Sequence, residues 1–245
     1  MDFDLSEEQK MIRDTARDFA QREVAPKAAE LDKTGRWPTE IVLRMAELGF
    51  LGMMVPEQYG GGGMDCVSYA LAMEEVSAAC ASCGVIMSVN NSLFCDPVNK
   101  FGTEEQKKEI LTPTAQGKML GCFALTEPMS GSDAQTMVTT ATKKGDGWVI
   151  NGAKNWITNG PEADHVIVFA VTDKVGGDPE KKIPPKLKHT AFLVKKGSEG
   201  FTQNPPDHKL GIHAAHSCTV FFENCRVPKA NQIGETGGGF KIAMS

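Results

Sequence analysis

The hydrophobic pattern of this chain changes its period near Met119, and this change limits the folds available to it. Before that point, apolar residues recur at spacings of three and four, the period of an amphipathic helix. After it, they come in short runs separated by Gly, Asn and Asp, as in strands joined by turns. Because no helical pattern interrupts these runs, we expect antiparallel hairpins in a barrel or sandwich, not a doubly wound sheet.

The two periods predict an α+β multidomain chain, and 245 residues are enough for two ordinary domains. We expect an N-terminal all-α domain at residues 1–118 and a middle antiparallel β-barrel domain at 119–229. Residues 230–245 are expected to form a linker and only the start of a C-terminal helical domain. The hydrophobic helix start at 240–244 predicts that this last domain continues beyond the present sequence.

Helix-start signals occur twice in the first half. Ser6 with Gln9, and Thr103 with Gln106, have the capping-box spacing. In such a box a hydroxyl and an amide satisfy backbone N–H groups that have no partner inside the helix. Each pair therefore predicts a helix that begins at the next residue.

Other segments of the first half also have helical character. A helix is expected at 39–48 with Gly49 just past its end, and another after Asp65. The apolar, small-residue run at 81–93 has no clean polar face. Such a pattern favours a buried helix or the wall of a pocket.

In the second half, strand-length apolar runs occur at 121–126, 165–171, 190–194 and 218–227. The segment 139–160 is expected to contain three further strands, separated by a glycine turn and by Asn151-Gly152. Asn-Gly is a strong signal for a two-residue hairpin, because a type I′ turn needs positive φ at both central residues.

Composition and charge exclude several classes of protein. The net charge of −5 argues against a nucleic-acid partner, and no apolar run is long enough to span a membrane. The start of the chain has neither a signal-peptide nor a transit-peptide pattern. Seven cysteines without framework spacing favour reduced thiols, as in the cytosol or the mitochondrial matrix.

Several motifs of known chemistry are absent or incomplete. The sequence contains no G-x-G-x-x-G, no P-loop and no G-x-S-x-G. Cys80-x-x-Cys83 lies in an apolar helical stretch without a second pair, which favours buried structural thiols over metal or redox chemistry. His213-x-x-His216 lacks a convincing third metal ligand nearby. The lysine-rich stretch at 173–189 is expected to be a solvated loop, or to attract an anionic ligand.

The stretch ALTEPMSGSDA at 124–134 allows three interpretations. Ser132 beside Asp133 would be a nucleophile next to an acid, but no motif supplies the histidine between them. Glu127 would be a general acid. Alternatively, the loop after a strand would hold a polar ring edge or a phosphate with its backbone N–H groups and hydroxyls.

A second strand end, KNWITNG at 154–160, has a similar character. Residues 156 and 158 point to one face of a strand, so Trp156 and Thr158 are expected side by side. An indole and a hydroxyl beside a polar loop suit a large planar heteroaromatic ligand. The alternative is a hairpin with an ordinary core tryptophan.

Together these motifs resemble one family. ALTEP-x-SGSDA, KNWITN, VPEQYGGGGMD, GVIMSVNNSL, ENCRVP and GGGFKIAM occur in the order typical of acyl-CoA dehydrogenases. The likeness runs the whole length of the chain and is closest to short-chain (butyryl-CoA) members. It implies a helical domain, a β-barrel domain and a C-terminal four-helix domain.

The resemblance also implies an activity. Such a protein binds FAD and oxidises an acyl-CoA thioester to trans-2-enoyl-CoA, in fatty-acid β-oxidation or branched amino-acid breakdown. A carboxylate removes the α-proton, the flavin N5 accepts the hydride, and electrons pass to an electron-transfer flavoprotein. The full-length family form is a tetramer. The resemblance implies the mitochondrial matrix for a eukaryotic protein and the cytoplasm otherwise.

By resemblance, site residues follow from the two strand ends. The backbone of Thr126 would bond the flavin pyrimidine ring, Trp156 would cover one flavin face, and the Thr158 hydroxyl would reach N5. Ser132 would contact phosphate-bearing parts of FAD or of the acyl-CoA substrate. The flavin-contacting residues expected are Phe123, Ala124, Leu125, Thr126, Ser132, Trp156, Ile157 and Thr158. Glu127 is then a structural part of the loop.

Some positions depart from the family pattern. Met129 and Thr136 stand where small residues are common, and His213 stands where an arginine is usual. The catalytic glutamate of the family belongs to the C-terminal domain, and no carboxylate of this chain matches it by motif. We therefore expect the chain alone to be inactive as an acyl-CoA dehydrogenase. The alternatives are an inactive truncated isoform that binds flavin, acyl-CoA or other subunits, and a flavin oxidase on the same scaffold.

Overall fold

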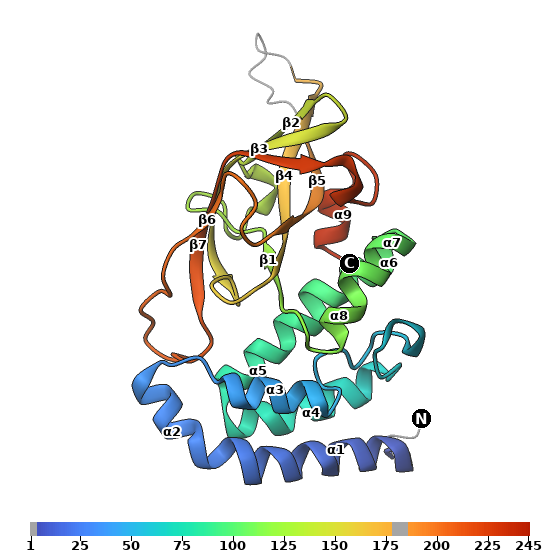
Figure 1. Ribbon diagram of the computed structural model, residues 1–245, viewed down its shortest axis with the longest axis vertical. Coiled ribbons are helices and arrows are strands. Elements are labelled where there is room, and N and C mark those ends of the chain that lie inside the picture. The colour runs from blue at the N-terminus through green and yellow to red at the C-terminus, as the bar shows by residue number, and fades with distance from the viewer. Residues whose placement is uncertain (1–3, 178–185) are drawn as a thin grey trace.

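The computed structural model describes residues 4–177 and 186–245 and divides them into a helical part and a β-sheet part. Helices occupy the chain up to residue 115, and strands begin at 121. The sheet stands on the helical part, which forms the lower half of the view in Figure 1. The predicted order of a helical part followed by a β-sheet domain is therefore confirmed.

The helical part consists of α-helices with short π and 3₁₀ turns between them. In chain order they are α1 (Glu7–Phe19), η1 (Ala20–Val24), α2 (Ala25–Thr34), α3 (Thr39–Glu47), η2 (Glu57–Tyr59), α4 (Cys66–Ala79), α5 (Ala81–Ser88), η3 (Val89–Cys95), α6 (Asp96–Phe101), α7 (Glu104–Gln106), η4 (Lys107–Leu111) and α8 (Thr112–Ala115). Among the described residues, none of the helices is both long and apolar enough to cross a membrane.

The helix-start predictions are confirmed. Both capping boxes form, and Ser6 and Thr103 accept from the backbone N–H groups of Gln9 and Gln106. The carboxylate of Asp65 caps α4 through the N–H of Ser68 at 2.7 Å. These local signals succeed because a cap acts within one turn and needs no distant partner.

The predicted buried helix at 81–93 is also confirmed. It is α5 continued by η3, and Ile86, Met87 and Asn91 in it are buried. The side chain of Asn91 hydrogen-bonds Met53 N–H and the carbonyl oxygen of Phe50, and thus ties this helix to the segment after α3. A buried polar side chain of this kind is satisfied by backbone groups.

Among residues 4–177 and 186–245, the sheet contains eight strands, and one further α-helix follows the last strand. The strands are β1 (Gly121–Ala124), β2 (Thr140–Lys144), β3 (Gly147–Thr158), β4 (His165–Val175), β5 (Lys186–Lys195), β6 (Phe201–Gln203), β7 (Ser217–Pro228) and β8 (Gln232–Ile233). Short 3₁₀ turns η5 (Ala134–Thr136) and η6 (Lys229–Asn231) precede β2 and β8. The lysine-rich loop predicted at 173–189 lies partly outside the described residues.

The strand order is β6-β7-β3-β2-β4-β5-β8, with β1 paired to β4. Most pairs are antiparallel as predicted, but β1 and β2 each pair with β4 in parallel. The chain reverses once between β2 and β3 and again between β3 and β4, so β4 runs in the same direction as β1 and β2. The middle domain, which we expected to be antiparallel, is thus mainly antiparallel with two parallel pairings.

The predicted hairpin at Asn151-Gly152 is wrong. Both residues lie inside the single long strand β3, which pairs with β7 on either side of them. The register shifts between Ile150 and Gly152, so the dipeptide forms a bulge. Gly152 has φ of 149°, and a Cβ there would lie 2.4 Å from the Thr139 hydroxyl oxygen. Because Gly152 has no side chain, β3 can pack closely against the segment before β2.

The segment after residue 229, expected to be a linker, takes part in the sheet. Gln232 and Ile233 pair with Phe192 and Ala191 of β5 as strand β8. The helix start predicted in GGGFKIAM forms as α9 (Gly239–Ala243), which lies beside β5 and near α6 (Figure 1).

Candidate functional site

A pocket of about 260 Å³ lies where the ends of β1 and β3 meet the helix wall of η3. We call it the strand-tip pocket. It is lined by Val89, Leu93, Phe123, Leu125, Thr126, Trp156, Ile157 and Thr158. Six of the eight residues predicted to contact a cofactor therefore surround one cavity. The other two, Ala124 and Ser132, are not among its lining residues.

The helix wall and β1 approach each other closely. A Cβ on Gly121 would lie 2.0 Å from a ring carbon of Phe94, a fully buried residue of η3. The Gly121 N–H donates to the Asn90 side chain at 3.0 Å. Beyond this contact, Val89 and Leu93 face the pocket. The sequence prediction of a helix or pocket wall at 81–93 is confirmed in both respects.

Trp156 has an unusual backbone conformation at the pocket. Its φ is 61°, a left-handed conformation that bulky residues rarely adopt. The β3–β7 register shifts between Lys154 and Ile157, so this tryptophan belongs to a bulge. In this bulge the Trp156 side chain points outward, and the residue is 58% exposed. Such strain, about 1–3 kcal/mol, is typical of functional positions.

Hydrogen bonds connect the two strand ends and the helix wall. The N–H of Asn155 donates to the Thr126 carbonyl at 2.8 Å, joining β3 to the end of β1. Asn159, just past β3, donates from its side chain to the Ile86 carbonyl of α5 at 3.2 Å. The relative positions of Thr126, Trp156 and the helix wall are therefore set by direct bonds.

The loop after β1 folds back on itself. Glu127 and Ser130 exchange two backbone hydrogen bonds around a tight turn, at 2.9 and 3.1 Å. Met129 lies at the tip of this turn and is 91% exposed, so its size meets no steric limit. Ser132 is exposed on the same loop, outside the lining of the pocket.

Glu127 and Lys154 form a buried ion pair beneath this loop. Their side chains are 1% and 0% exposed, and Lys154 Nζ lies 2.8 Å from Glu127 Oε1. The carboxylate also accepts from the N–H groups of Val138 and Thr139, at 2.7 and 3.0 Å.

The environment of this pair fixes its charges. Burial opposes ionisation of Glu127, but the bonds from Lys154, Thr139 and Val138 outweigh it and lower the pKa of Glu127. Burial lowers the pKa of Lys154 to about 8, although Glu127 opposes the shift. Glu127 thus has a structural role, and its full set of donors argues against its interpretation as a general acid.

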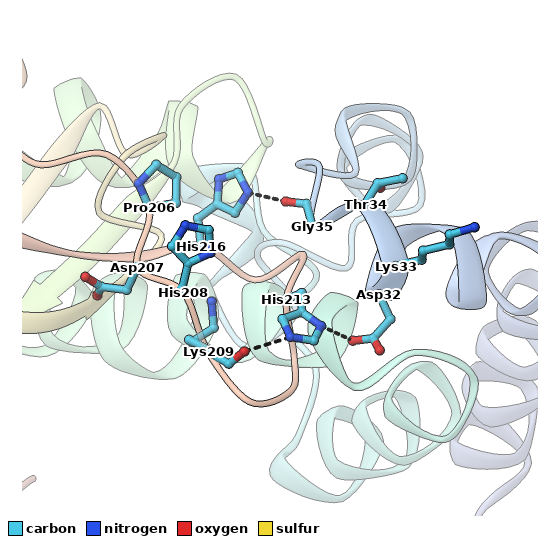
Figure 2. A pocket seen from close by; sticks show the side chains of 10 residues that line it. All are labelled: Asp32, Lys33, Thr34, Gly35, Pro206, Asp207, His208, Lys209, His213 and His216. Atoms are coloured by element: carbon cyan, nitrogen blue, oxygen red, sulfur yellow. Dashed lines mark hydrogen bonds and ion pairs between the residues drawn. The ribbon is translucent and has the colours of Figure 1, made fainter.

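A second cavity, of about 380 Å³, lies between the end of α2 and the loop at 206–216 (Figure 2). We call it the histidine pocket. His213 Nδ1 lies 2.9 Å from Asp32 Oδ1, and its Nε2 lies 2.7 Å from the Lys209 carbonyl oxygen. His216 contacts Glu162 at 2.6 Å and the Gly35 carbonyl at 2.8 Å. His213 thus connects the loop at 206–216 to Asp32 of α2. His216 connects the same loop to the Gly35 backbone just after α2 and to Glu162.

These contacts occupy the nitrogens of the His-x-x-His motif. The ring nitrogens of His213 and His216 all face oxygen acceptors, so none is directed at a shared metal position. Within residues 4–177 and 186–245, no cluster of three metal-ligating side chains occurs.

The cysteines are all free. Cys80 does not lie inside a helix as predicted, because it is the extended residue between α4 and α5. The pair is nevertheless buried: Cys83 has no exposed surface and Cys80 has 9%. No second cysteine pair accompanies it among the described residues, and the buried-thiol interpretation agrees with this placement.

The chemistry of the strand-tip pocket fits a planar aromatic group. The Trp156 ring offers an exposed apolar face, and Phe123 and Leu125 add further apolar surface. The Thr126 and Thr158 side chains supply hydrogen-bonding groups at the edge. Its lining contains no carboxylate, histidine, lysine or cysteine, so the pocket itself supplies binding and orientation.

Comparison with protein families defines the class. Residues 6–118 match the N-terminal domain of acyl-CoA dehydrogenases, and residues 122–225 match the middle domain. Through these two domains, which account for most of its length, the chain belongs to the acyl-CoA dehydrogenase family.

Individual relatives show the kind of acyl-CoA dehydrogenase to which this chain is similar. The short-chain specific acyl-CoA dehydrogenase of mitochondria from Rattus norvegicus is 49% identical over 241 residues, 98% of this chain and 57% of that protein. The butyryl-CoA dehydrogenase structure from Megasphaera elsdenii is 40% identical with a TM-score of 0.90, covering 100% of this chain and 63% of that one. The chain thus spans about three fifths of the length of these relatives.

A second similar structure is of a protein in complex with FADH2. It is the glutaryl-CoA dehydrogenase from Mycobacterium smegmatis in complex with FADH2, 33% identical with a TM-score of 0.88. The alignment covers 98% of this chain and 58% of that one.

Sequence reasoning missed two features of the site. Lys154 of β3 was not recognised as buried, and its partner Glu127 lies in the loop after β1. The histidine pocket was missed because Asp32 and His213 are far apart in sequence. The one signal in the sequence was His213, which the resemblance had singled out as a departure from the family pattern.

Proposed function

We propose that this chain forms the flavin-facing part of an acyl-CoA dehydrogenase that acts on short-chain acyl-CoA thioesters. The strand-tip pocket carries the proposal, because it gathers a strained, exposed indole, two threonines and an apolar floor. Its family membership and its likeness to short-chain and butyryl-CoA dehydrogenases support the same activity. A similar protein is solved with FADH2, which supports FAD as the cofactor.

The residues of this chain would bind and orient the flavin. Trp156 would cover one face of the ring system, and the Thr158 hydroxyl would donate a hydrogen bond near N5. Thr126 would bond the pyrimidine edge, while Phe123, Ala124, Leu125 and Ile157 shape the strand ends. Ser132, on the exposed loop, would contact a phosphate-bearing part of FAD or of the substrate. When bound, the flavin supplies the hydride acceptor for oxidation of the acyl chain.

The proton step needs a base that the pocket lining does not supply. No carboxylate lines the strand-tip pocket, and Glu127 is held in its ion pair. We propose that the base is a glutamate outside this chain, and that the 245 residues alone have little acyl-CoA oxidation. Loss of a positioned base commonly lowers a rate by about 10²–10⁴-fold. Butyryl-CoA-dependent dye reduction measures this directly, and ordinary turnover would contradict it.

Partners and location follow from the same proposal. The substrate would be an acyl-CoA, and the electrons would leave to an electron-transfer flavoprotein. The full enzyme would be a homo-oligomer. For a eukaryotic source the mitochondrial matrix is the proposed compartment, as in the name of the Rattus norvegicus relative, and otherwise the cytoplasm.

Flavin binding by the purified chain tests the proposal. FAD is titrated while quenching of its fluorescence is followed, because stacking on an indole quenches flavin emission. We expect Trp156→Ala to weaken binding about fivefold, corresponding to an aromatic contact of about 1 kcal/mol. Phe221→Ala removes a partly exposed aromatic ring of β7 outside the pocket lining and serves as the control. Equal binding by both variants would contradict the assigned role of the pocket.

One alternative has a specific observation in its favour. Because the pocket lining has binding groups without an acid or base, the chain fits a flavin- or acyl-CoA-binding fragment that associates with other subunits. The two functions differ in one measurement. Co-elution with a full-length relative without any gain in dye reduction would favour the fragment.

A further inference from the structure

The buried ion pair of Glu127 and Lys154 lies directly behind the strand-tip pocket. Neither side chain reaches solvent, and each has its partner at 2.8 Å. A buried ion pair gives up the hydration of two charges, and well-packed apolar residues often replace one without loss of stability. The location of this pair therefore calls for an explanation other than overall stability.

The pair holds three separate segments at one point. Lys154 donates from β3 to the Leu125 carbonyl at 3.0 Å, at the end of β1. Glu127 lies in the loop and accepts from Val138 and Thr139, where the chain returns toward β2. Lys154 of β3 thus bonds the departing end of the loop directly, and it is connected to the returning end through Glu127.

We propose that Glu127 and Lys154 are positioning residues that set the geometry of both strand ends around the ligand of the strand-tip pocket. The inference rests on the proposed flavin site.

Thr126 and Trp156 are the residues whose positions the pair controls. Thr126 lies between Leu125, which accepts from Lys154, and Glu127, which binds the same ammonium. Trp156 follows Lys154 by two residues, and the intervening Asn155 bonds the Thr126 carbonyl. Thr126 and Trp156, which both line the pocket, are therefore held through one charged pair. Binding sites need such support to keep ligand groups within about 0.5 Å of their working positions.

The test compares a neutral double variant with a matched control. In the double variant Glu127→Gln with Lys154→Met, the side chains keep nearly the same volume and no charge is left unpaired. Lys143→Met removes an exposed lysine from neighbouring β2 and serves as the control. Thermal unfolding shows whether each variant is folded.

Two readouts separate positioning from stability. The first is hydrogen exchange of the Asn155 amide in the unliganded chain, measured by NMR. The second is the circular dichroism induced in bound FAD, which depends on flavin orientation. We expect the folded double variant to exchange at Asn155 at least tenfold faster and to change the flavin signal, with the control unchanged. Unchanged exchange and an unchanged signal in the double variant would overturn the proposal.

A pH titration of the unmutated chain provides an independent test if the double variant unfolds. Raising the pH through the pKa of Lys154, about 8, neutralises the ammonium without a mutation. His189 is a further titratable group that faces the pair, and burial lowers its pKa below the ordinary value, outside this window. Exchange at Asn155, corrected for its intrinsic pH dependence, should accelerate with a midpoint near pH 8. A flat profile across the pH range in which Lys154 loses its proton, followed by NMR of its side chain, would overturn the proposal.

The design separates this inference from the proposed function. Failure of the unmutated chain to bind FAD would count against the flavin site. The exchange of Asn155 needs no ligand, so it decides whether the pair positions the strand ends in either case.

Discussion

The two pockets of this protein use ion pairs in different ways. Behind the strand-tip pocket, Glu127 and Lys154 are sealed from water and connect three segments of the sheet part. At the histidine pocket, His213 and Asp32 remain partly in water (Figure 2). In the interior the removal of one partner leaves a charge without hydration, whereas at the surface water replaces it. The first pair should therefore determine geometry, and the second should matter little.

The largest expected effect on stability follows from removing the charge of only one partner of the buried ion pair. Glu127→Gln leaves the Lys154 ammonium buried without a counter-charge. We expect the free energy of unfolding to fall by about 3 kcal/mol, as for other half-broken buried pairs. Urea unfolding measures this, with Glu199→Gln on an exposed loop as the control. A loss below about 1 kcal/mol would show that the pair is less isolated from water than its burial indicates.

This pair also shows the limit of sequence reasoning. The strand-tip pocket could be predicted because six of its eight lining residues lie in two short motifs at strand ends. Burial of Lys154 could not, because a lysine on a strand is usually exposed and its partner is 27 residues away in sequence. Charge pairing across a fold depends on packing that no local pattern contains.

The same reason explains the errors in the fold. Capping boxes at Ser6 and Thr103 were predicted correctly because their partners lie three residues away. The Asn151-Gly152 hairpin was wrong because pairing of β3 with β7, some seventy residues later, overrode the local turn preference. The parallel placement of β1 beside β4 likewise depends on the whole sheet.

His216 should give an intermediate, pH-dependent effect. The bond to Glu162 raises its pKa against the opposing effect of burial, and the Gly35 carbonyl adds to the rise, while Lys209 opposes it. Both ring nitrogens face acceptors, so only the imidazolium satisfies both contacts. Because the folded pKa is above the unfolded value near 6.5, the stabilisation is complete below pH 6.5. It is lost as the pH rises through the raised folded pKa.

Comparison of the unmutated chain with His216→Gln checks whether the stabilisation by His216 decreases as the pH rises. Charge-assisted hydrogen bonds of this kind contribute about 1.5 kcal/mol. We expect that difference in the free energy of unfolding at pH 6 and a smaller one at alkaline pH. A difference that grows with pH would mean that the neutral ring is the stabilising form. Retention of the effect in high salt is expected, since the His216 side chain is only 12% exposed.

The smallest effect is expected at the other histidine, where the comparison between the pockets is most direct. Asp32 is 60% exposed and His213 is 34% exposed, although their 2.9 Å contact is nearly as short as the buried one. Asp32→Asn keeps an acceptor for the ring, so the free energy of unfolding should change by less than about 0.5 kcal/mol. Urea unfolding at low and high salt provides the measurement. A loss near that of Glu127→Gln would mean that distance, not burial, determines the contribution of an ion pair in this protein.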